Sequence, residues 1–467
     1  MTATALTAAS YNRVLGANDR VGVGFIGFGL IGKQHVNNFK TSFKDVDRVA
    51  MCDVYKPRLE EGLAYMESPS AKGYSDFRKM YEDKNINGVV VSTPDHWHAM
   101  LTIMACAAGK DVYVEKPLTV FIDEGKWMIQ AMNKYKRVVV VGTQRNHNPG
   151  HLAAKKIFES GVLGKIQMVK LGAGGRNIYP GFGKTPGANP PADFDYDLWL
   201  GPAPKRPFQN HRGLYHFRWF WDYSGGQLTN LGAHSVAAFL LVTGVKGPTR
   251  VVSFGGRFTL EDDGETPDLQ ECIYNFPNFM MTMGVREANG YRDATGSVIL
   301  GNKGNLLLGS NQVISERHGD PVNSIPRFVG HPAGGPVYNN TPSVPWIEGL
   351  AETGGRGASG GRGGAETARA APEGRESLEE QMFNANKRDW IDCIKSRNKP
   401  FCNLEMGHRT AIICNLGNMS LRLGGRAIQW DPEKEVVVGD KEAAAMCTKQ
   451  YRAPWDGILK NILKAEP

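Results

Sequence analysis

The chain has 467 residues, of which 41% are hydrophobic and 22% charged, a composition typical of folded globular proteins and not of disordered ones. Its length suggests two or three domains. The net charge of +8 is too small to indicate a nucleic-acid-binding protein, and no apolar run approaches the roughly 18 residues of a membrane span.

Residues 1–18 are rich in small side chains and carry little charge. We interpret them either as the remnant of an export leader or as a flexible N-terminus, since a basic start is missing. The first alternative places the protein in the periplasm and the second is compatible with the cytoplasm. The sequence leaves both open.

Residues 19–145 alternate between short apolar stretches and helical patterns. This alternation predicts a doubly wound parallel sheet, a Rossmann domain. The expected strands are residues 21–26, 48–53, 87–93, 111–114 and 137–142, and the expected helices start near residue 33 and cover 57–66, 99–108 and 122–134.

The pattern changes in residues 146–435, where strands follow one another without regular helices between them. This predicts an α+β domain with a large, mostly antiparallel open sheet. Residues 351–376 are rich in Gly, Ala and Arg and are expected to form a mobile insertion, and helices after residue 381 are expected to pack back toward the first domain. Residues 436–467 are interpreted as a C-terminal extension.

Gly27, Gly29 and Gly32 form a Gly-x-Gly-x-x-Gly motif between a predicted strand and a predicted helix. These positions allow a tight turn, the approach of a pyrophosphate to the backbone, and close helix packing, in that order. Asp53 ends the second strand, where a carboxylate accepts hydrogen bonds from a ribose diol. The pattern predicts a dinucleotide site that favours NAD, although Arg58 nearby can accept the 2′-phosphate of NADP.

Lys116 lies in a Glu-Lys-Pro segment directly after a predicted strand, at the sheet edge where ligands bind. Pro117 stiffens the turn and favours an extended backbone at Lys116. An ammonium group there can hydrogen-bond a substrate hydroxyl and polarise the carbonyl that forms from it. The alternative is an ordinary solvated lysine.

A glycine-rich segment, residues 224–234, ends in His234. If it is helical from Gln227 onward, Asn230 and His234 lie four residues apart on one face. Histidine titrates near neutrality, which suits a base that takes a hydroxyl proton during hydride transfer. The alternative is a core histidine bonded to the backbone.

Residues 211–223 are dense in aromatic, arginine and histidine side chains, which suits a sugar pocket but is also typical of an aromatic core segment. The side chains expected to contact substrate here are Arg218, Trp221, Asp222 and Tyr223. The seven cysteines are widely spaced and include no C-x-x-C pair, so no metal site is expected.

These motifs together resemble the Gfo/Idh/MocA family, named after glucose–fructose oxidoreductase, inositol dehydrogenase and a rhizopine catabolism protein. The resemblance spans most of residues 21–431. Its most specific feature is the Glu-Lys-Pro motif followed by a glycine-rich segment that ends in histidine. The segments that carry the resemblance are residues 27–32 with His35, Thr93 and Pro94 with His98, 108–110, 115–117 with Glu124, Gly142 with Arg145, 161–166, 197–202 and 225–234.

The resemblance implies an activity that oxidises or reduces sugars or cyclitols with NAD, and an open sheet that mediates a homo-oligomer, a dimer or tetramer. It makes Lys116 the active-site lysine and His234 the catalytic histidine, with Asn230 beside them. The residues expected to bind the cofactor are Gly27, Gly29, Leu30, Ile31, Gly32, Asp53, Thr93, Pro94, His98, Glu115, Lys116 and Arg145. Those expected to bind substrate are Lys116, Arg145, Arg218, Trp221, Asp222, Tyr223 and His234.

Asn230 departs from the family pattern, which has aspartate at this position. An asparagine can hold one nitrogen of His234 but does not stabilise an imidazolium as a carboxylate does. Either Asp222 or another carboxylate replaces it, or the proton chemistry differs. The hypotheses are therefore, in order, an NAD-dependent dehydrogenase of a sugar, glycoside or cyclitol, an NAD-recycling glycosidase, and a non-catalytic sugar or nucleotide sensor.

Overall fold

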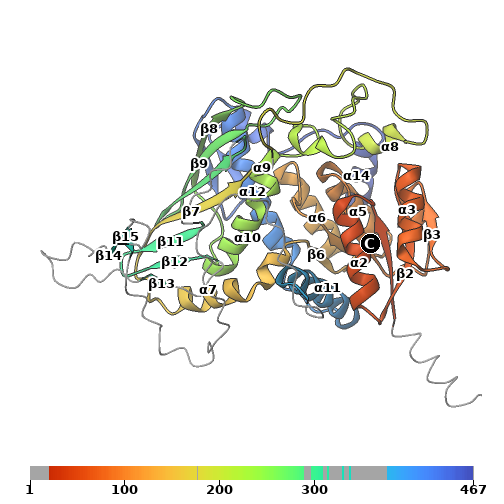
Figure 1. The fold of residues 1–467 in the computed structure, drawn as a ribbon, viewed down its shortest axis with the longest axis horizontal. Helices are drawn as coiled ribbons and strands as arrows, with labels where there is room; N and C mark the ends of the chain where they lie inside the picture. Colours follow the sequence, from red (N-terminus) through yellow and green to blue (C-terminus); the bar gives the residue numbers. More distant parts are fainter. Residues whose placement is uncertain are drawn as a thin grey trace, which may run out of the picture.

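The structure, a computed structural model, describes residues 20–175, 177–288, 296–308 and 376–465, together with three short strands between residues 313 and 337. Two large β-sheets lie side by side, each with helices packed against it (Figure 1). The expected leader, and the Gly/Arg-rich insertion apart from Glu376, lie outside the described residues. Within the described part of the chain, no helix combines the length and the apolar character that crossing a bilayer requires.

The N-terminal sheet has six parallel strands in the order β3-β2-β1-β4-β5-β6. The order reverses between β1 and β4, and in such sheets ligands bind at this switch point. The strands are β1 (Val21–Ile26), β2 (Val46–Cys52), β3 (Lys72–Tyr74), β4 (Gly88–Val91), β5 (Asp111–Val114) and β6 (Val139–Val141). The helical segments between and after them are α2 (Leu30–Ser42), α3 (Lys56–Met66), α4 (Phe77–Tyr81), η1 (Asp95–Trp97), α5 (His98–Ala107), α6 (Ile122–Lys134) and η2 (Gln144–His147).

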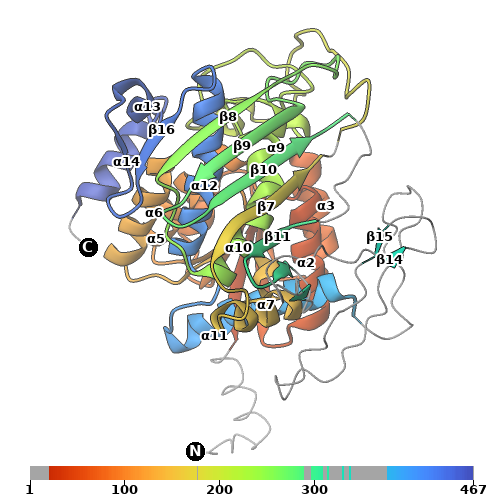
Figure 2. The same ribbon diagram turned by 90° about the vertical axis from the view of Figure 1, so that its left-hand side faces the viewer.

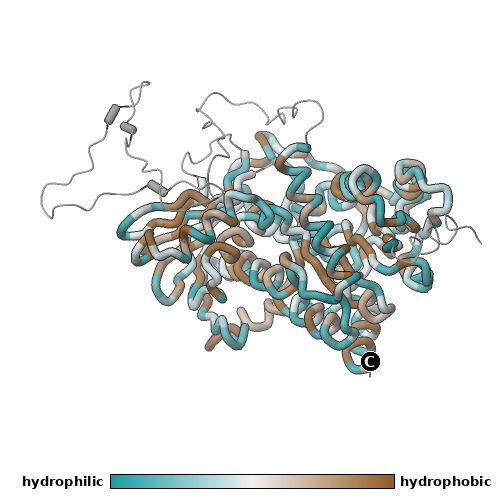
Figure 3. Tube along the Cα trace, turned by 90° about the horizontal axis from the view of Figure 1, so that it is seen from below, coloured by the Kyte–Doolittle hydropathy of each residue, from teal (hydrophilic) through white to brown (hydrophobic). Residues whose placement is uncertain are grey.

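Helices cover both faces of this sheet, which is why its central strands are apolar throughout. On one face Phe25 of β1 packs with Phe39 of α2 and with Trp390, which belongs to a helix near the C-terminus. On the other face Val89 and its neighbours pack with α5 and α6. The hydropathy colouring shows brown, apolar stretches running through the interior (Figure 3).

The second sheet has nine strands in the order β13-β12-β11-β7-β10-β9-β8-β16-β17. Only β7 and β10 pair in parallel among these neighbours, so the prediction of a mostly antiparallel second sheet is confirmed. The strands are β7 (Ile166–Gly174), β8 (Arg250–Gly256), β9 (Leu269–Asn275), β10 (Met280–Arg286), β11 (Val298–Gly301), β12 (Asn305–Leu307), β13 (Val313–Ile314), β16 (Ile428–Asp431) and β17 (Val436–Val438). A separate pair consists of β14 (Val329–Gly330) and β15 (Pro336–Val337).

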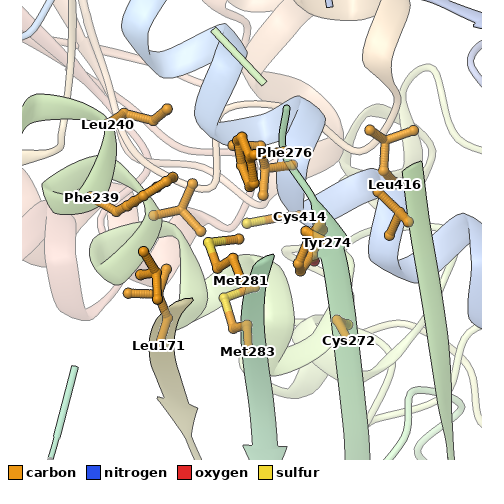
Figure 4. Close-up of a cluster of buried hydrophobic side chains, with 14 of the residues drawn as sticks. Leu171, Phe239, Leu240, Cys272, Tyr274, Phe276, Met281, Met283, Cys414 and Leu416 are labelled. Atoms are coloured by element: carbon orange, nitrogen blue, oxygen red, sulfur yellow. The ribbon is translucent and has the colours of Figure 1, made fainter. Parts of the chain in front are cut away.

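One face of the nine-stranded sheet is covered by helices and the other is open (Figure 2). The covering helices are α7 (Pro149–Glu159), α9 (Gly226–Asn230), α10 (Gly232–Thr243) and α12 (Leu404–Arg422). Between helices and sheet lies a buried cluster in which Phe239 of α10 faces Met281 of β10 and Leu416 of α12 completes the layer (Figure 4). Along β9 buried and exposed residues alternate, as expected for a strand with one covered face.

Two segments connect the two sheets. Residues 177–225 leave β7, carry α8 (Tyr196–Leu200) and η3 (His216–Trp219), and cross over the N-terminal sheet (Figure 1). The C-terminal part contributes α11 (Leu378–Ser396), which packs on α2, and α14 (Trp455–Lys464), which packs on α5 and α6, while α13 (Lys441–Ala445) packs on β17. These two segments enclose the carboxyl edge of the parallel strands.

Candidate functional site: a cleft at the carboxyl edge of the parallel sheet

The turn after β1 is shaped by its three glycines. Gly27 has a φ of +91°, and a side chain at Gly32 would lie 2.1 Å from the Gly27 carbonyl oxygen. A Cβ at Gly29, in contrast, would have nothing within 4 Å. The turn is therefore tight on its inner side and open at Gly29, where the first amides of α2 face outward. This is the cradle that a pyrophosphate requires.

Asp53 lies beside this turn and is buried. Its carboxylate accepts the N–H of Phe28 at 2.8 Å and the N–H of Tyr55 at 2.9 Å. Burial raises the pKa of Asp53, and the two backbone hydrogen bonds oppose that rise. Because each carboxylate oxygen has two lone pairs, Asp53 can still accept from a ribose diol. Arg58 lines the same end of the cleft.

The loop that carries Tyr55 is covered by the crossing segment. Lys56 donates its N–H to the Asp193 carbonyl at 2.9 Å, and Asp195 donates its N–H to the Val54 carbonyl at 2.9 Å. Trp97 adds an indole hydrogen bond of 2.8 Å to the Trp199 carbonyl. The second domain thus fixes, by backbone hydrogen bonds, the end of the cleft beside Asp53, which we call the adenosine end because Asp53 is expected to bind the ribose.

Thr93 and Pro94 line the cleft after β4, whereas His98 lies behind them and is buried. The His98 ring bonds the Pro117 carbonyl through Nδ1 at 2.7 Å and the Thr93 carbonyl through Nε2 at 2.9 Å. His98 therefore joins the turn after β4 to the turn after β5. It supports the cleft and does not line it.

Lys116 follows β5 and enters the cleft, and the Lys116–Pro117 peptide is cis. Its Nζ donates to the Asn230 carbonyl at 3.1 Å and to Asn230 Oδ1 at 3.2 Å. The Asn230 amide nitrogen in turn donates to Gln227 Oε1 at 3.1 Å, which fixes the orientation of the amide. Asn230 thus holds the lysine ammonium from two oxygens.

His234 also lines the cleft, from the first turn of α10, and is 7% exposed. The expected single helix through Asn230 and His234 is interrupted at Leu231: α9 ends at Asn230 and α10 begins at Gly232. The break lets the Asn230 carbonyl accept from Lys116, as no residue continues the helical ladder over it. Helical spacing alone did not predict this arrangement.

A buried charged network supports the Lys116 turn from behind. Glu115 Oε1 lies 2.9 Å from His35 Nε2, and Glu115 Oε2 accepts the N–H of Lys116 at 3.1 Å. Burial raises the pKa of Glu115, but the His35 hydrogen bond and nearby positive charges outweigh it, so the net pKa is lowered. Lys387 of α11 is fully buried in this network, and burial lowers its pKa to about 7.

The cleft is a cavity of about 320 Å³ that brings most of the expected residues together. Those that line it are Gly27, Gly29, Leu30, Ile31, Asp53, Thr93, Pro94, Glu115, Lys116, Arg145, Arg218, Asn230 and His234. Gly32 lies behind the turn that it allows. Among the described residues, no group of three or more His, Cys, Asp or Glu side chains is arranged to hold a metal ion.

The structure does not bring Trp221, Asp222 and Tyr223 to the cleft. Asp222 pairs with Lys449 at 2.9 Å and with Arg206 at 2.8 Å, so it does not replace the missing aspartate beside His234. Tyr223 is buried, and the Trp221 indole donates to the Glu265 carbonyl. Their aromatic pattern was equally typical of a core segment.

Asp95 is a cleft residue that sequence analysis missed. It is buried and accepts a 2.5 Å hydrogen bond from Ser224. Burial raises its pKa, opposed by the charges of His98, Arg218 and Lys116. Its position between Pro94 and His98, both singled out from the sequence, was the available signal. Phe383 and Glu379 of α11 also line the cleft, and no local motif marks them.

Comparison with known proteins agrees with this geometry. The model of an oxidoreductase family's NAD-binding Rossmann fold (GFO_IDH_MocA) matches residues 21–143, and the model of the same family's C-terminal alpha/beta domain matches residues 151–252 and 371–457. Together they cover about two thirds of the chain. The chain belongs to the Gfo/Idh/MocA oxidoreductase family.

Curated relatives of this family member match about a third of the chain. Inositol 2-dehydrogenase of Salmonella typhimurium is 32% identical over 147 residues, which are 31% of this chain and 44% of the relative. The scyllo-inositol 2-dehydrogenase (NAD(+)) of Bacillus subtilis is 31% identical over 169 residues, 36% of this chain and 46% of the relative. The chain thus spans less than half the length of the curated relatives it matches.

Solved structures share the whole fold. The WlbA dehydrogenase of Bordetella pertussis, in complex with NADH and UDP-GlcNAcA, has a TM-score of 0.59 at 19% identity and covers 88% of this chain and 99% of its own. The myo-inositol dehydrogenase of Lactobacillus casei has a TM-score of 0.57 at 16% identity, covering 91% and 99%. The Gfo/Idh/MocA chain therefore carries the family's NAD-binding Rossmann domain, and the open cradle at Gly29 fits that cofactor.

Proposed function

We propose that the protein is an NAD-dependent dehydrogenase that oxidises a hydroxyl group of a sugar or cyclitol. The observation that carries this proposal is that Lys116 and His234 line the same cleft as the dinucleotide turn. Lys116 is also fixed in place by two oxygens of Asn230. The names of the inositol dehydrogenases that are similar to part of this chain support the same reaction class.

In this proposal Lys116 and His234 act on the same substrate hydroxyl in different ways. Lys116 donates a hydrogen bond to the reacting hydroxyl oxygen and stabilises negative charge that develops there. His234 takes the hydroxyl proton as general base, the role that histidine fills most often in enzymes. The carbon–hydrogen bond breaks with its electron pair as the carbonyl forms, and NAD held at the Gly29 turn and Asp53 would supply the acceptor for that hydride. Glu115 and His35 hold the Lys116 backbone during the step.

The test is to incubate the full chain with NAD and a panel of sugars, glycosides and cyclitols while following reduced nicotinamide by absorbance. We expect stoichiometric NADH from at least one compound, and loss of that signal in Lys116→Ala. Unchanged turnover in Lys116→Ala would overturn the role given to the lysine.

The NAD-recycling glycosidase was motivated by Asn230, which breaks the expected pairing with His234. In the structure Asn230 is bound to Lys116, so the asparagine has a function without any change of reaction. The same panel separates the two hypotheses. Release of an aglycone without net formation of NADH would contradict the dehydrogenase hypothesis and support the glycosidase hypothesis.

We infer that the expected homo-oligomer forms through the open face of the nine-stranded sheet. Exposed apolar side chains gather there on three adjacent strands: Phe254 on β8, Leu269 and Ile273 on β9, and Met280 on β10. Several exposed apolar side chains on one sheet face are typical of protein–protein interfaces. Sedimentation of the wild type and of Phe254→Asp tests this, with dissociation expected in the variant.

A further inference from the structure

We propose that the sugar or cyclitol substrate carries an anionic group, a carboxylate or a phosphate, that Arg145 and Arg218 bind inside the cleft. This inference rests on the proposed dehydrogenase function and names its substrate class. Both arginines line the cavity that contains Lys116 and His234. Guanidinium groups bind carboxylate and phosphate oxygens with paired, charge-assisted hydrogen bonds.

The backbone of Arg145 is held by hydrogen bonds, and its side chain is exposed. It lies in η2, directly after β6, and its carbonyl accepts from His151 Nδ1 at 2.7 Å and from the N–H of Asn148 at 3.0 Å. Its side chain is exposed toward the cleft and forms no salt bridge with any described residue. An arginine held this way beside the reacting groups offers its charge to a ligand.

Arg218 approaches the cleft from the second domain. Its Nη1 donates to the Tyr215 carbonyl at 3.1 Å, and its guanidinium lies 4.5 Å from the centre of the Phe217 ring and 5.3 Å from that of Tyr215. These contacts restrict the side chain before substrate binds. A preorganised guanidinium loses less conformational freedom when it binds an anion.

The buried carboxylates of the cleft already have partners. Asp53 accepts two backbone N–H groups, Glu115 pairs with His35, and Asp95 accepts from Ser224. The remaining lining carboxylate, Glu379, is exposed on the first turn of α11, the helix that packs on α2 at the dinucleotide side.

Near Lys116 and His234, at what we call the reaction end of the cleft, the described lining residues include three cations, Lys116, Arg145 and Arg218, and two carboxylates, Asp95 and Glu115. An acidic sugar brings negative charge to these cations, which a neutral polyol does not. Electrostatic complementarity of this kind selects partners by charge.

The experiment compares matched neutral and anionic substrates with the full chain and NAD. The pairs are glucose with glucuronate, glucose with glucose 6-phosphate, and myo-inositol with its monophosphate. We expect kcat/KM for an anionic member to exceed that of its neutral partner by about 10-fold or more, since a hydrogen bond between charged groups is the stronger kind. The glucuronate and phosphate arms decide which anion the arginines accept.

Two variants test whether the two arginines cause the preference for the anionic substrate. Arg145→Gln and Arg218→Gln should each raise KM for the anionic substrate by about 10- to 100-fold more than they raise KM for the neutral one. Arg409→Gln removes the same charge from α12, away from the cleft, and should leave the anionic-to-neutral ratio unchanged. Equal or better turnover of the neutral members by the wild type would overturn the proposal.

Binding calorimetry keeps this test separate from the proposed function. If no compound yields NADH, the dehydrogenase proposal fails, but titration of the NAD-loaded chain with glucuronate, glucose 6-phosphate and glucose still measures anion recognition. Tighter binding of an anion that is lost in Arg145→Gln supports the inference. Equal binding of all three ligands would exclude it.

Discussion

The two ends of the cleft are built differently. At the adenosine end Asp53 and the loop after β2 are fixed by backbone hydrogen bonds from Phe28, Tyr55 and the crossing segment. At the reaction end Lys116 lies above a buried network of titratable side chains, Glu115, His35 and Lys387. The first end therefore depends on chain geometry, and the second on side-chain charge.

Substitution at Lys116 should have the largest effect. Lys116→Ala removes the ammonium from the reaction end, and we expect kcat to fall by about 10²- to 10³-fold, the usual contribution of one donor that stabilises developing negative charge. NAD affinity, measured by fluorescence titration, should change little because the adenosine end is untouched. A parallel loss of NAD binding would show that the two ends are not independent.

Substitution at Asp53 should act on the opposite end. Asp53→Ala removes the ribose acceptor and the partner of two backbone N–H groups, so we expect NAD affinity to fall by about 10- to 100-fold. Discrimination against NADP should relax, because Arg58 remains beside the site. Asp53→Asn is the matched control, since it keeps one acceptor oxygen and should lose less. An unchanged preference between NAD and NADP would contradict this role.

The same contrast separates what the sequence predicted from what it did not. The adenosine end is local: Gly27, Gly29 and Asp53 belong to one strand–turn–helix–strand unit, so spacing alone predicted their arrangement. The contact of Lys116 with Asn230 joins residues 114 positions apart and depends on the helix break at Leu231. A pattern within one segment carries no information about such a contact, and Asn230 was therefore paired with His234.

The buried network behind Lys116 could not be predicted from the sequence, for the same reason. Lys387 has the sequence pattern of an exposed helix residue, because lysine is almost never fully buried. Only the packing of α11 on α2 places it inside the molecule. In contrast, the parallel N-terminal sheet and the mostly antiparallel second sheet followed from hydrophobic periodicity, and both are confirmed.

Asn230→Asp tests the link between Asn230 and Lys116. A carboxylate beside the lysine Nζ favours its protonated form, so the pH dependence of kcat should move to higher pH. Asn230→Ala is the control without added charge, and it should lower kcat a few-fold with little movement of the profile, since the backbone carbonyl of residue 230 remains. If Asn230 acted on His234 alone, the lysine-dependent limb of the profile would stay in place in both variants.

Lys387→Met should have the smallest effect on activity and a distinct effect on stability. Burial lowers the pKa of Lys387 to about 7 from an ordinary value of 10.5, so between these values the unfolded chain binds more protons than the folded one. The stability contributed by this residue is thus full above 10.5, decreases as pH falls, and is lost below about 7. The free energy of unfolding of the wild type should therefore rise from pH 7 to pH 10 relative to that of Lys387→Met.

At pH 7 the Met variant should be as stable as the wild type or more stable by about 1 kcal/mol, because the hydrogen-bond acceptor of the buried amine, Asn38 Oδ1 at 3.2 Å, is neutral and offsets little of the cost of burying a charge. Chemical unfolding across this pH range measures both effects. Lys395→Met is the matched control on the same helix, where the exposed ammonium pairs with Asp45. Its pH dependence between 7 and 10 should follow the wild type. Parallel curves for Lys387→Met and the wild type would show that the reaction end, like the adenosine end, is held by geometry alone.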